Sequence, residues 1–266
     1  MPTYVHLVRH AQGYHNLTGN HHLRDPDLTP IGTEQCARLQ KTFPLLPQIT
    51  HLVASPLRRT IYTCLLSFEP ALQNPGIVTK KVIAFPQLQE VSPMPCDTGS
   101  ELDKLVAEFG PAGQVDLGLV TEGWNDKVSA SSPYVPEMHK LETRARNTRL
   151  WLRELGAKFE AENPGVDAHI VAVTHGGFLH FLTQDWDGMN PQAGTGWENT
   201  EWRTYGFVNG EDGDDEAGLR ETGVSWRRRR GSEKGLSETE QMELRSAVTE
   251  GLEVEKRRWA ENGKAE

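Results

Sequence analysis

Two histidines in this sequence directly follow apolar runs that are typical of buried strands. His10 comes after residues 4–8 and Arg9, and His175 comes just after residues 168–173. In α/β folds the carboxyl ends of the strands line the crevice in which ligands bind. We therefore expect the two imidazoles to lie close together at one edge of a sheet, where they could act as nucleophile or proton carrier.

Positive charge is predicted at the same edge. Arg9 ends the first strand, and Arg58 and Arg59 stand at the start of the helix that follows the second strand. Guanidinium groups match the geometry of phosphate oxygens, whereas an isolated arginine pair is more often a solvated helix face. The arginines indicate an anion site only in combination with the two histidines.

The residues after the second histidine favour an anion as well. Gly176 and Gly177 lie between a strand and a helix, so backbone N–H groups should be exposed at a helix N-terminus. Alone, this signal is weak, because glycines after a strand often serve a tight turn. The joint occurrence of all these features predicts a phosphate site.

Strands and helices alternate along the chain and must position these residues. The predicted strands are residues 4–8, 51–54, 82–85, 168–173 and 202–208. The predicted helices are residues 30–42, a helix capped at Ser55-Pro56 and running to about Leu66, and residues 101–109, 137–162, 178–183 and about 237–259. This order predicts an α/β fold, a three-layer sandwich with a mostly parallel central sheet flanked by helices.

The sequence predicts one main domain over residues 1–210. Residues 86–136, rich in proline and glycine, are expected to form a loop and helix excursion over the site, since long connections are usually functional. Residues 211–266 are expected to form a hairpin, with residues 219–226 pairing back, and a terminal helix. The basic run 227–230 is interpreted as a solvated turn pairing with the acidic run 211–216, although an anionic partner is an alternative.

Composition excludes several other classes of protein. The 266-residue chain has a formal net charge of −9, which argues against nucleic-acid binding. No apolar run approaches the roughly 20 residues of a membrane helix, and no signal peptide is recognised. Cys36, Cys64 and Cys96 form no C-x-x-C pair, which fits a reducing compartment and excludes a cysteine-based zinc site. We expect a cytoplasmic protein with a small-molecule partner.

Five short segments together resemble the signature motifs of a known family. In chain order they are Leu7-Val8-Arg9-His10-Ala11-Gln12, Asp27-Leu28-Thr29-Pro30-Ile31-Gly32, Ser55-Pro56-Leu57-Arg58-Arg59, Leu88-Gln89-Glu90 and Thr174-His175-Gly176. With Asn16 placed six residues after His10, this order resembles the histidine phosphatase superfamily, which includes phosphoglycerate mutases and fructose-bisphosphatase domains. The resemblance covers roughly residues 4–208 and departs at Ala11, where glycine is usual.

The resemblance implies a phosphoglycerate mutase-like fold and hydrolysis of a phosphorylated metabolite. His10 would be the nucleophile, and Glu90 would protonate the leaving oxygen and later activate water. The residues that would bind phosphate or substrate are Arg9, Arg59, His175, Asn16 and Gly176. The register of the motif assigns this role to Arg59 and not to Arg58, and the arginines should lower the pKa of His10. No metal or other cofactor is required, because arginines and histidines would supply the charge.

Two alternatives to a phosphatase remain open. A mutase of the family carries a characteristic tyrosine-glycine segment after the acidic residue, and here Glu90 is followed by Val-Ser-Pro-Met-Pro-Cys-Asp, so a mutase is disfavoured. An inactive phosphate-binding protein of the same fold would typically lack the nucleophile or an arginine, and neither is missing. His15 fits either a structural or a site role. His21 and His22 fit an exposed loop better than the substrate mouth.

Overall fold

Within the residues that the structure describes, a seven-stranded mixed sheet has the order β4-β3-β2-β5-β1-β6-β7. The computed structural model describes residues 2–74, 78, 80–191, 194–208, 216–231 and 235–262. Strands β1 to β5 pair in parallel, and β6 and β7 extend the sheet antiparallel beside β1. The strands are β1 (Thr3–Arg9), β2 (His51–Ala54), β3 (Val82–Ala84), β4 (Val115–Asp116), β5 (Ala168–Thr174), β6 (Trp202–Phe207) and β7 (Leu219–Glu221).

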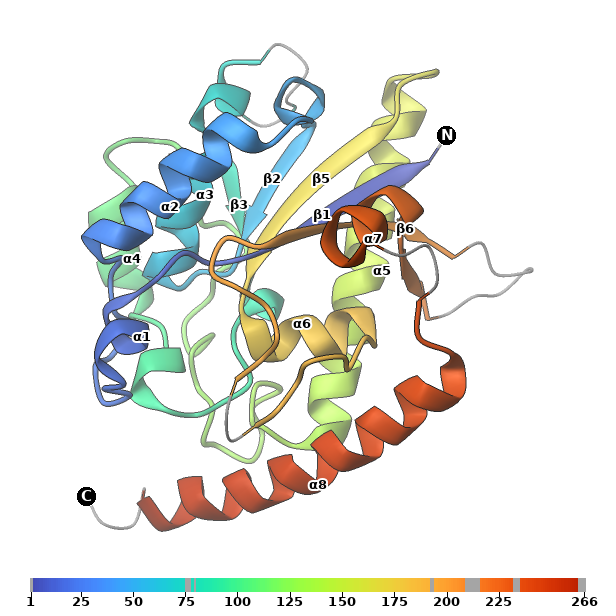
Figure 1. Cartoon of the computed structure of the whole chain (residues 1–266). Coiled ribbons are helices and arrows are strands. Elements are labelled where there is room, and N and C mark those ends of the chain that lie inside the picture. Colours follow the sequence, from blue (N-terminus) through green and yellow to red (C-terminus); the bar gives the residue numbers. More distant parts are fainter. Residues whose placement is uncertain are drawn as a thin grey trace.

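Helices cover both faces of this sheet (Figure 1). They are α1 (Tyr14–Thr18), α2 (Pro30–Thr42), α3 (Arg58–Leu72), α4 (Leu102–Phe109), α5 (Met138–Glu162), α6 (Gly176–Thr183), α7 (Gly223–Arg230) and α8 (Glu238–Asn262). Three single-turn 3₁₀ helices lie at Leu46–Gln48, Pro86–Leu88 and Pro95–Asp97. The predicted three-layer α/β sandwich with a mostly parallel sheet is therefore confirmed.

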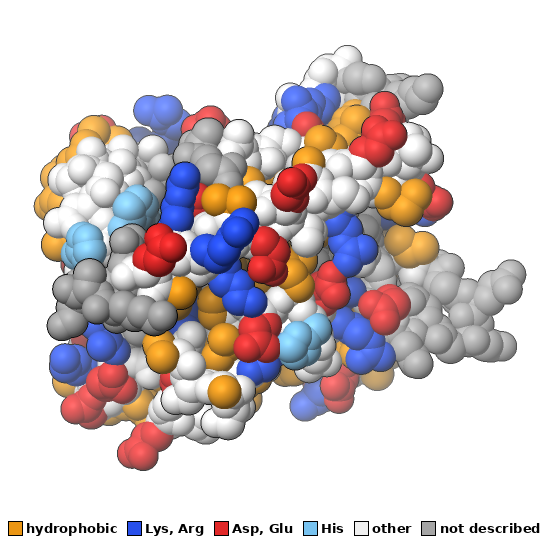
Figure 2. Space-filling model, turned by 90° about the horizontal axis from the view of Figure 1, so that it is seen from below, with side chains coloured by type: hydrophobic (Ala, Val, Ile, Leu, Met, Phe, Trp, Pro, Cys, Tyr) orange, Lys and Arg blue, Asp and Glu red, His pale blue; other side chains and the backbone are white. Residues whose placement is uncertain are grey.

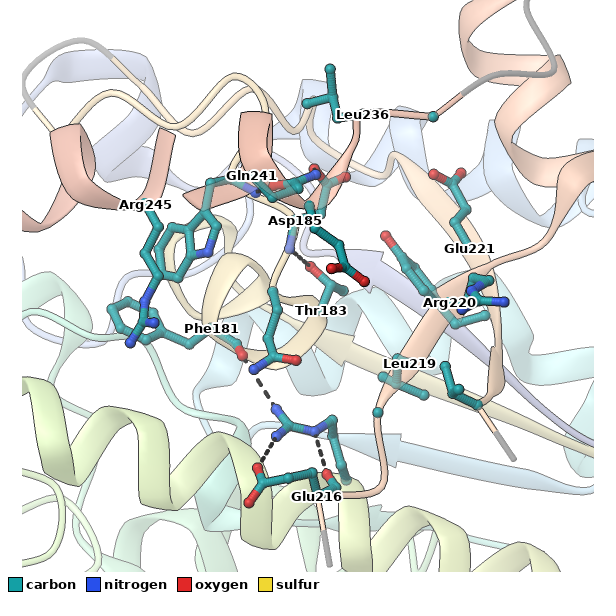
Figure 3. A pocket seen from close by; sticks show the side chains of 18 of the residues that line it. Phe181, Thr183, Asp185, Glu216, Leu219, Arg220, Glu221, Leu236, Gln241 and Arg245 are labelled. Carbon is teal, nitrogen blue, oxygen red and sulfur yellow. Dashed lines mark hydrogen bonds and ion pairs between the residues drawn. The ribbon is translucent and has the colours of Figure 1, made fainter. Parts of the chain in front are cut away.

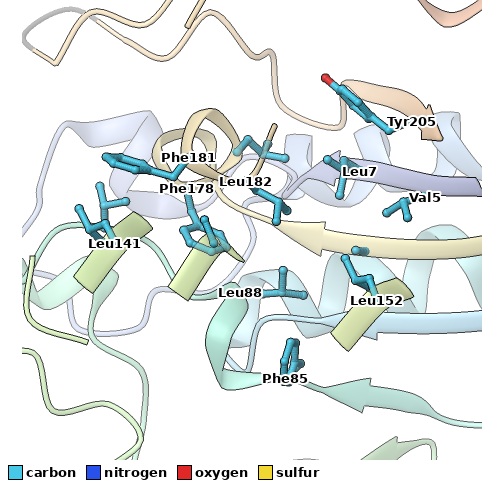
Figure 4. Close-up of a cluster of buried hydrophobic side chains, with 14 of the residues drawn as sticks. Val5, Leu7, Phe85, Leu88, Leu141, Leu152, Phe178, Phe181, Leu182 and Tyr205 are labelled. Atoms are coloured by element: carbon cyan, nitrogen blue, oxygen red, sulfur yellow. The ribbon is translucent and has the colours of Figure 1, made fainter. Parts of the chain in front are cut away.

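Alternate side chains of β5 divide the core into two layers. Ile170 and Ala172 pack with residues of α5 and α6, whereas Val171 and Val173 pack with residues of α2 and α3. Every residue of β5 is buried, as expected for a strand in the middle of a parallel sheet. Figure 4 shows the first layer, where side chains of α5 and α6 lie against the sheet. The central position of β5 places its carboxyl end, and so the second histidine, in the middle of the ligand edge.

One predicted helix start is right and another is wrong. Thr29 caps α2 by accepting a hydrogen bond from the Gly32 N–H at 3.0 Å, and Pro30 is the first helical residue. The helix expected from Ser55 begins instead at Arg58 and continues to Leu72. The Ser55 hydroxyl is instead hydrogen-bonded to the side chain of His175, the residue that follows β5.

The C-terminal region departs most from the prediction. Residues Leu219–Glu221 pair with β6, and soon after them the chain forms α7, which contains the basic run 227–230. Thr222 caps this helix through the Ser225 N–H, and Gly231 ends it with a φ of 66°. The hairpin expected over residues 219–226 and the basic turn are therefore wrong beyond residue 221.

The basic run pairs with acids other than those expected. Arg229 contacts Glu221 and Asp185, and Arg230 contacts Asp187. Residues 211–215 of the acidic run lie outside the described residues, and Glu216 pairs with arginines of α5. Most of the expected pairing between the two runs therefore lies outside the described residues.

Helix α8 lies along the lower side of the molecule in Figure 1, past α5 and towards α1. Val248 and Leu252 are buried in the same layer of the core as α5 and α6. None of the described helices is both long and apolar enough to cross a membrane.

Candidate active site

The parallel pairing of β1 with β5 brings the two predicted histidines together. Arg9 is in register with Thr174, and the backbone N–H of His10 donates to the Thr174 carbonyl at 2.9 Å. The rings of His10 and His175 lie with their centroids 5.1 Å apart. Both follow the carboxyl ends of adjacent strands, as expected.

The hydrogen bonds of His10 fix which ring nitrogen carries the lone pair. Nδ1 lies 2.8 Å from the Ala11 carbonyl and must donate to it, while the Arg59 Nε–H donates to Nε2 at 3.3 Å. Burial, and then the charges of Arg59 and Arg9, hold the pKa of His10 well below its ordinary value. His10 is therefore a neutral imidazole with its lone pair on Nε2. Ala11 is not among the residues with positive φ, so alanine fits this position without strain.

The two arginines at the start of α3 point in different directions. Arg59 is buried, and besides His10 it donates to the Cys96 carbonyl at 2.6 Å and to Asp97 at 2.9 Å. Arg58 instead pairs with Glu108 at 2.8 Å and Asp27 at 2.9 Å. The expected difference between the neighbours is present in the geometry.

Hydrogen bonds to Arg59 and Ser55 fix the ring of His175. The Arg59 Nη2–H donates to its Nδ1 at 3.0 Å, so the opposite nitrogen, Nε2–H, donates to the Ser55 hydroxyl at 2.9 Å. Burial and the charge of Arg59 hold the pKa of His175 well below its ordinary value. His175 is fully buried and is not among the residues that line the pocket beside His10, so a direct contact with substrate stays a prediction.

Two further polar groups beside His10 have no hydrogen-bond partner among the described residues. The Arg9 Nη1–H donates to the Trp197 carbonyl, but its Nε is buried without a hydrogen-bond partner. The same holds for Nδ1 of His15, whose ring centroid lies 5.8 Å from that of His10. Unpaired buried polar atoms are rare in proteins, and both residues line one pocket. This is the arrangement expected where an anionic ligand completes the hydrogen bonding.

The pocket itself has a volume of about 240 Å³. Its polar lining consists of Arg9, His10, His15, Asn16, His21, Arg59, Glu90, Ser92, Asp97, Asn190 and Thr195. Asn16 is placed by the Gly13 N–H, which donates to its side-chain oxygen at 3.1 Å. His21 lies at the mouth although its side chain is exposed, whereas His22 is not part of the lining. His15, unassigned from sequence, thus belongs to the site.

Glu90 occupies the N-terminus of α6. The Gly177 and Phe178 N–H groups donate to its carboxylate at 3.0 and 2.9 Å, and the Val91 N–H donates at 2.8 Å. Burial raises the pKa of Glu90, and the nearby Asp97 carboxylate raises it further, against the effect of the N–H donors. A raised pKa is what a proton donor needs near neutral pH.

The anion at this helix N-terminus is therefore Glu90, where we expected the phosphate. Gly177 lines the pocket, but Gly176 is buried against Thr195, and a Cβ at Gly176 would collide with that side chain. A substrate contact by Gly176 stays a prediction. The observed reason for glycine at residue 176 is close packing.

Comparisons with known proteins identify the family of this chain. A family model described as the histidine phosphatase superfamily (branch 1) matches residues 5–212. The chain belongs to this superfamily. A phosphoglycerate mutase-like protein of Arabidopsis thaliana is 26% identical over 245 residues, which cover 77% of this chain and 84% of the relative.

Solved structures show the same fold for this histidine phosphatase superfamily member. Phosphoglycerate mutase from Bacillus anthracis str. Sterne superposes with a TM-score of 0.51 at 20% identity, covering 83% of this chain and 92% of that one. The ecdysone phosphate phosphatase of Bombyx mori, in complex with tungstate, also has a TM-score of 0.51, at 15% identity and the same coverage. Both phosphatases and mutases therefore share this architecture.

Asp97, Ser92 and Lys127 contribute to the hydrogen bonding of the site, and none of them was assigned to it from sequence. Asp97 accepts hydrogen bonds from Arg59 and, at 2.5 Å, from the Ser92 hydroxyl. Burial alone would raise the pKa of Asp97, but Arg59, Lys127 and Ser92 hold it below its ordinary value. Asp97 is thus a carboxylate that neutralises Arg59.

Lys127 cross-links the segment from Glu90 to Asp97 through hydrogen bonds. Its buried ammonium donates to the carbonyl oxygens of Glu90 at 2.7 Å, Ser92 at 3.0 Å and Asp97 at 2.6 Å, which uses all three N–H groups. It lies at the far end of the excursion 86–136, with no local motif to mark it. Among the described residues, no three histidine, cysteine, aspartate or glutamate side chains are grouped to hold a metal ion.

Proposed function

We propose that this protein is a metal-independent phosphatase that hydrolyses a small phosphorylated substrate through a phosphohistidine on His10. The observation that carries the proposal is the pairing of a neutral His10, with its lone pair on Nε2, and the unpartnered Nε of Arg9 in the same pocket. A nucleophile and an unused cationic donor lie side by side. Phosphoryl transfer needs both.

The first step transfers the phosphoryl group to the protein. Arg9 and Arg59 neutralise the phosphate oxygens, and a phosphate oxygen replaces His10 Nε2 as acceptor of the Arg59 Nε–H. The freed Nε2 lone pair attacks phosphorus, and the bond from phosphorus to the ester oxygen breaks. Glu90 in its protonated form, which its raised pKa favours, gives its proton to that oxygen, so an alcohol leaves.

The second step releases phosphate. Glu90, now a carboxylate, accepts a proton from water as the water oxygen attacks phosphorus. The bond between phosphorus and Nε2 breaks, and inorganic phosphate and neutral His10 are formed. Arg9 and Arg59 act on the oxygens in both steps, because charge develops on the same atoms each time.

Release of phosphate to water separates this proposal from its alternatives. Purified protein is assayed with a panel of phosphorylated metabolites, with and without a chelator, and inorganic phosphate is measured. Acid-labile, base-stable phosphoprotein is then trapped from the best substrate. Transfer of the phosphoryl group back to a product without release would indicate a mutase. Neither release nor phosphoprotein with any substrate would overturn the proposal.

We also propose that the protein works in the cytoplasm on a small molecule, without nucleic-acid or membrane partners. The net charge of −9 supports this, because an acidic protein is repelled by nucleic acids and anionic lipid surfaces. All three cysteines are free and buried, as suits a reducing compartment. Fractionation of cells that express the tagged protein tests the location, and recovery with membranes would contradict it.

A further inference from the structure

One wall of the active-site pocket comes from outside the part of the chain that the family model matches. That match covers residues 5–212, whereas α8 spans Glu238–Asn262. Leu252 and Trp259 of α8 nevertheless line the same pocket as His10. This wall is therefore an addition to the matched part of the fold.

Helix α8 is docked firmly enough to form a wall. Leu244, Val248, Leu252 and Trp259 fall within about 80° of the helix circumference, and all four pack against the main core. The face on which α8 lies carries acidic and basic side chains in mixture, with hydrophobic atoms interspersed (Figure 2). The helix thus turns one apolar stripe towards the body of the protein.

Polar contacts hold the N-terminal half of α8 in place. The Gln241 side chain accepts from the Trp186 N–H and donates to Asp185, both at 2.9 Å. Arg245 forms an ion pair with Glu142 of α5. Leu252 and Trp259 therefore take their position from contacts along the length of the helix.

The apolar wall stands beside the proposed proton donor. Val91 directly follows Glu90 and lines the pocket together with Leu252 and Trp259, and Val91, Leu252 and Trp259 also meet in an adjoining seam with almost no free space. Glu90 must lie within hydrogen-bond reach of the ester oxygen that leaves. The group attached to that oxygen therefore lies where Val91 and the α8 side chains form the surface.

The charged side chains of the pocket lining also favour a leaving group without negative charge. Among the described residues that line it, the only guanidinium or ammonium groups are Arg9 and Arg59, and the phosphate uses both. The acidic side chains of the lining are Asp97, which is a carboxylate, and Glu90, the proposed proton donor. A second phosphate or carboxylate on the substrate would meet no further cation and would be repelled.

We propose that Leu252 and Trp259 of α8, with Val91, form a leaving-group subsite that selects phosphate monoesters of apolar alcohols, above all those with a flat ring system. The proposal rests on the proposed phosphatase function. A tryptophan at the wall offers a broad face for stacking, and apolar surface is buried when a hydrophobic leaving group enters. Substrates with short polar leaving groups gain nothing from this wall.

Two substrates of similar leaving-group acidity test the subsite. Both 2-naphthylmethyl phosphate and glycerol 3-phosphate are esters of primary alcohols, so the chemical step is comparable. We expect the intact protein to show kcat/KM at least about 10-fold higher for the naphthylmethyl ester. Trp259→Ala should lower that value about 10- to 100-fold, mainly through KM, and change the glycerol ester less than about twofold.

Controls separate the subsite from general damage. Leu244→Ala removes an apolar side chain from the same stripe of α8 that does not line the pocket, and it should leave the ratio of the two substrates unchanged. Trp259→Phe should restore part of the preference. Inhibition by inorganic phosphate should be equal in all variants, because the arginines are untouched.

Three results would overturn the proposal. They are a preference of the intact protein for glycerol 3-phosphate, an equal loss on both esters in Trp259→Ala, and a changed ratio in Leu244→Ala. If phosphoprotein is still trapped, only the subsite fails. If no ester is hydrolysed and no phosphoprotein forms, the phosphatase function itself fails, and the subsite with it.

Discussion

The two ends of α6 open into two different hollows. The active-site pocket, about 240 Å³, lies at the N-terminal end, next to Gly177. A second hollow of about 970 Å³ lies at the C-terminal end, where Thr183 and Asp185 face α8 and β7 (Figure 3). The larger hollow is lined by more charged side chains than the active-site pocket, but the two differ in how these side chains are paired.

In the second hollow the guanidinium of Arg149 and the carboxylate of Glu221 are already paired, whereas Arg220 is exposed to solvent. Arg149 contacts Glu216, and Glu221 contacts Arg229 at 2.6 Å. Its unpartnered buried polar atoms include the Tyr205 hydroxyl and the Trp226 N–H, which belong to neutral side chains. In the active-site pocket the unpartnered atoms include a guanidinium nitrogen.

This difference shows that neither volume nor charge count identifies a site. Arg9 has a buried donor without an acceptor, and the pKa values of His10 and Glu90 are shifted in the directions that catalysis needs. Among the described residues that line it, the second hollow has neither a buried cationic donor without a partner nor a histidine or cysteine. The comparison predicts large effects on activity at one end of α6 and almost none at the other.

The largest effect is expected for His10→Ala. Loss of a covalent nucleophile should reduce kcat by at least about 10³-fold with every substrate, and no phosphoprotein should be trapped. The fold should persist, because His10 lines a pocket and its removal leaves a space open to the ligand site. Rates are measured with p-nitrophenyl phosphate, and folding by circular dichroism. More than a few per cent of the original rate would rule out the phosphohistidine.

Glu90→Gln should have an effect that depends on the leaving group. General acid catalysis is worth roughly 10²–10⁴-fold for a poor leaving group, so hydrolysis of an alkyl phosphate should fall by that factor. Hydrolysis of p-nitrophenyl phosphate should fall much less, because p-nitrophenolate leaves unprotonated. Equal losses on both esters would indicate a binding role. No loss on either would make Asp97 the next candidate for the donor.

The pH dependence of the same variant provides a second test. Because the pKa of Glu90 is raised, the protonated form persists to higher pH than for an ordinary carboxyl group. For alkyl phosphates, kcat should therefore decline as pH rises through the pKa of Glu90, and this decline should be absent in Glu90→Gln. A pH–rate profile with an unchanged alkaline limb in the variant would assign that limb to another group.

Arg59→Ala should damage catalysis far more than Arg58→Ala. Removing a group that stabilises transition-state charge typically costs about 10²–10³ in kcat. Arg58 is bound to Glu108 and Asp27 at a partly exposed position, so its loss should change kcat less than about threefold and cost about 1 kcal/mol of stability at most. Side-by-side kinetics and thermal melts check both values. Similar kinetic losses would reject the assignment of Arg59.

Local patterns account for what could be predicted from sequence. The strand ends at His10 and His175 follow from short buried runs, and their meeting follows from parallel pairing of β1 with β5. The roles of neighbouring arginines follow from helix geometry, since adjacent side chains point about 100° apart. Each of these inferences needs only a few consecutive residues.

Contacts between distant residues account for most of what was missed. Glu90 lies 87 positions before Gly177, so nothing in either segment shows that a carboxylate fills the N-terminus of α6. Lys127 likewise acts on carbonyl groups 30 or more positions away. Helix α7 is a different case, because its capping residues Thr222 and Gly231 were visible in the sequence. The hairpin predicted over residues 219–226 took no account of these caps.

The smallest effect is expected for Tyr205→Phe, in the second hollow. The ring of Tyr205 is buried in the core, but its hydroxyl has no hydrogen-bond partner among the described residues. Removing a buried, unsatisfied hydroxyl relieves its desolvation cost, so the free energy of unfolding should stay level or rise by about 1 kcal/mol. That corresponds to an increase of Tm of about 2–4 °C at most, with kcat/KM unchanged.

Tyr205→Leu is the matched control, because it removes the ring as well as the hydroxyl and should lower Tm through lost packing. The comparison between the two hollows depends on the phenylalanine variant. If Tyr205→Phe lowers Tm by several degrees, or reduces the rate on any substrate, the hydroxyl must have a partner in solution. The second hollow would then be a ligand site linked to catalysis through α6, and the contrast between the two ends of that helix would be wrong.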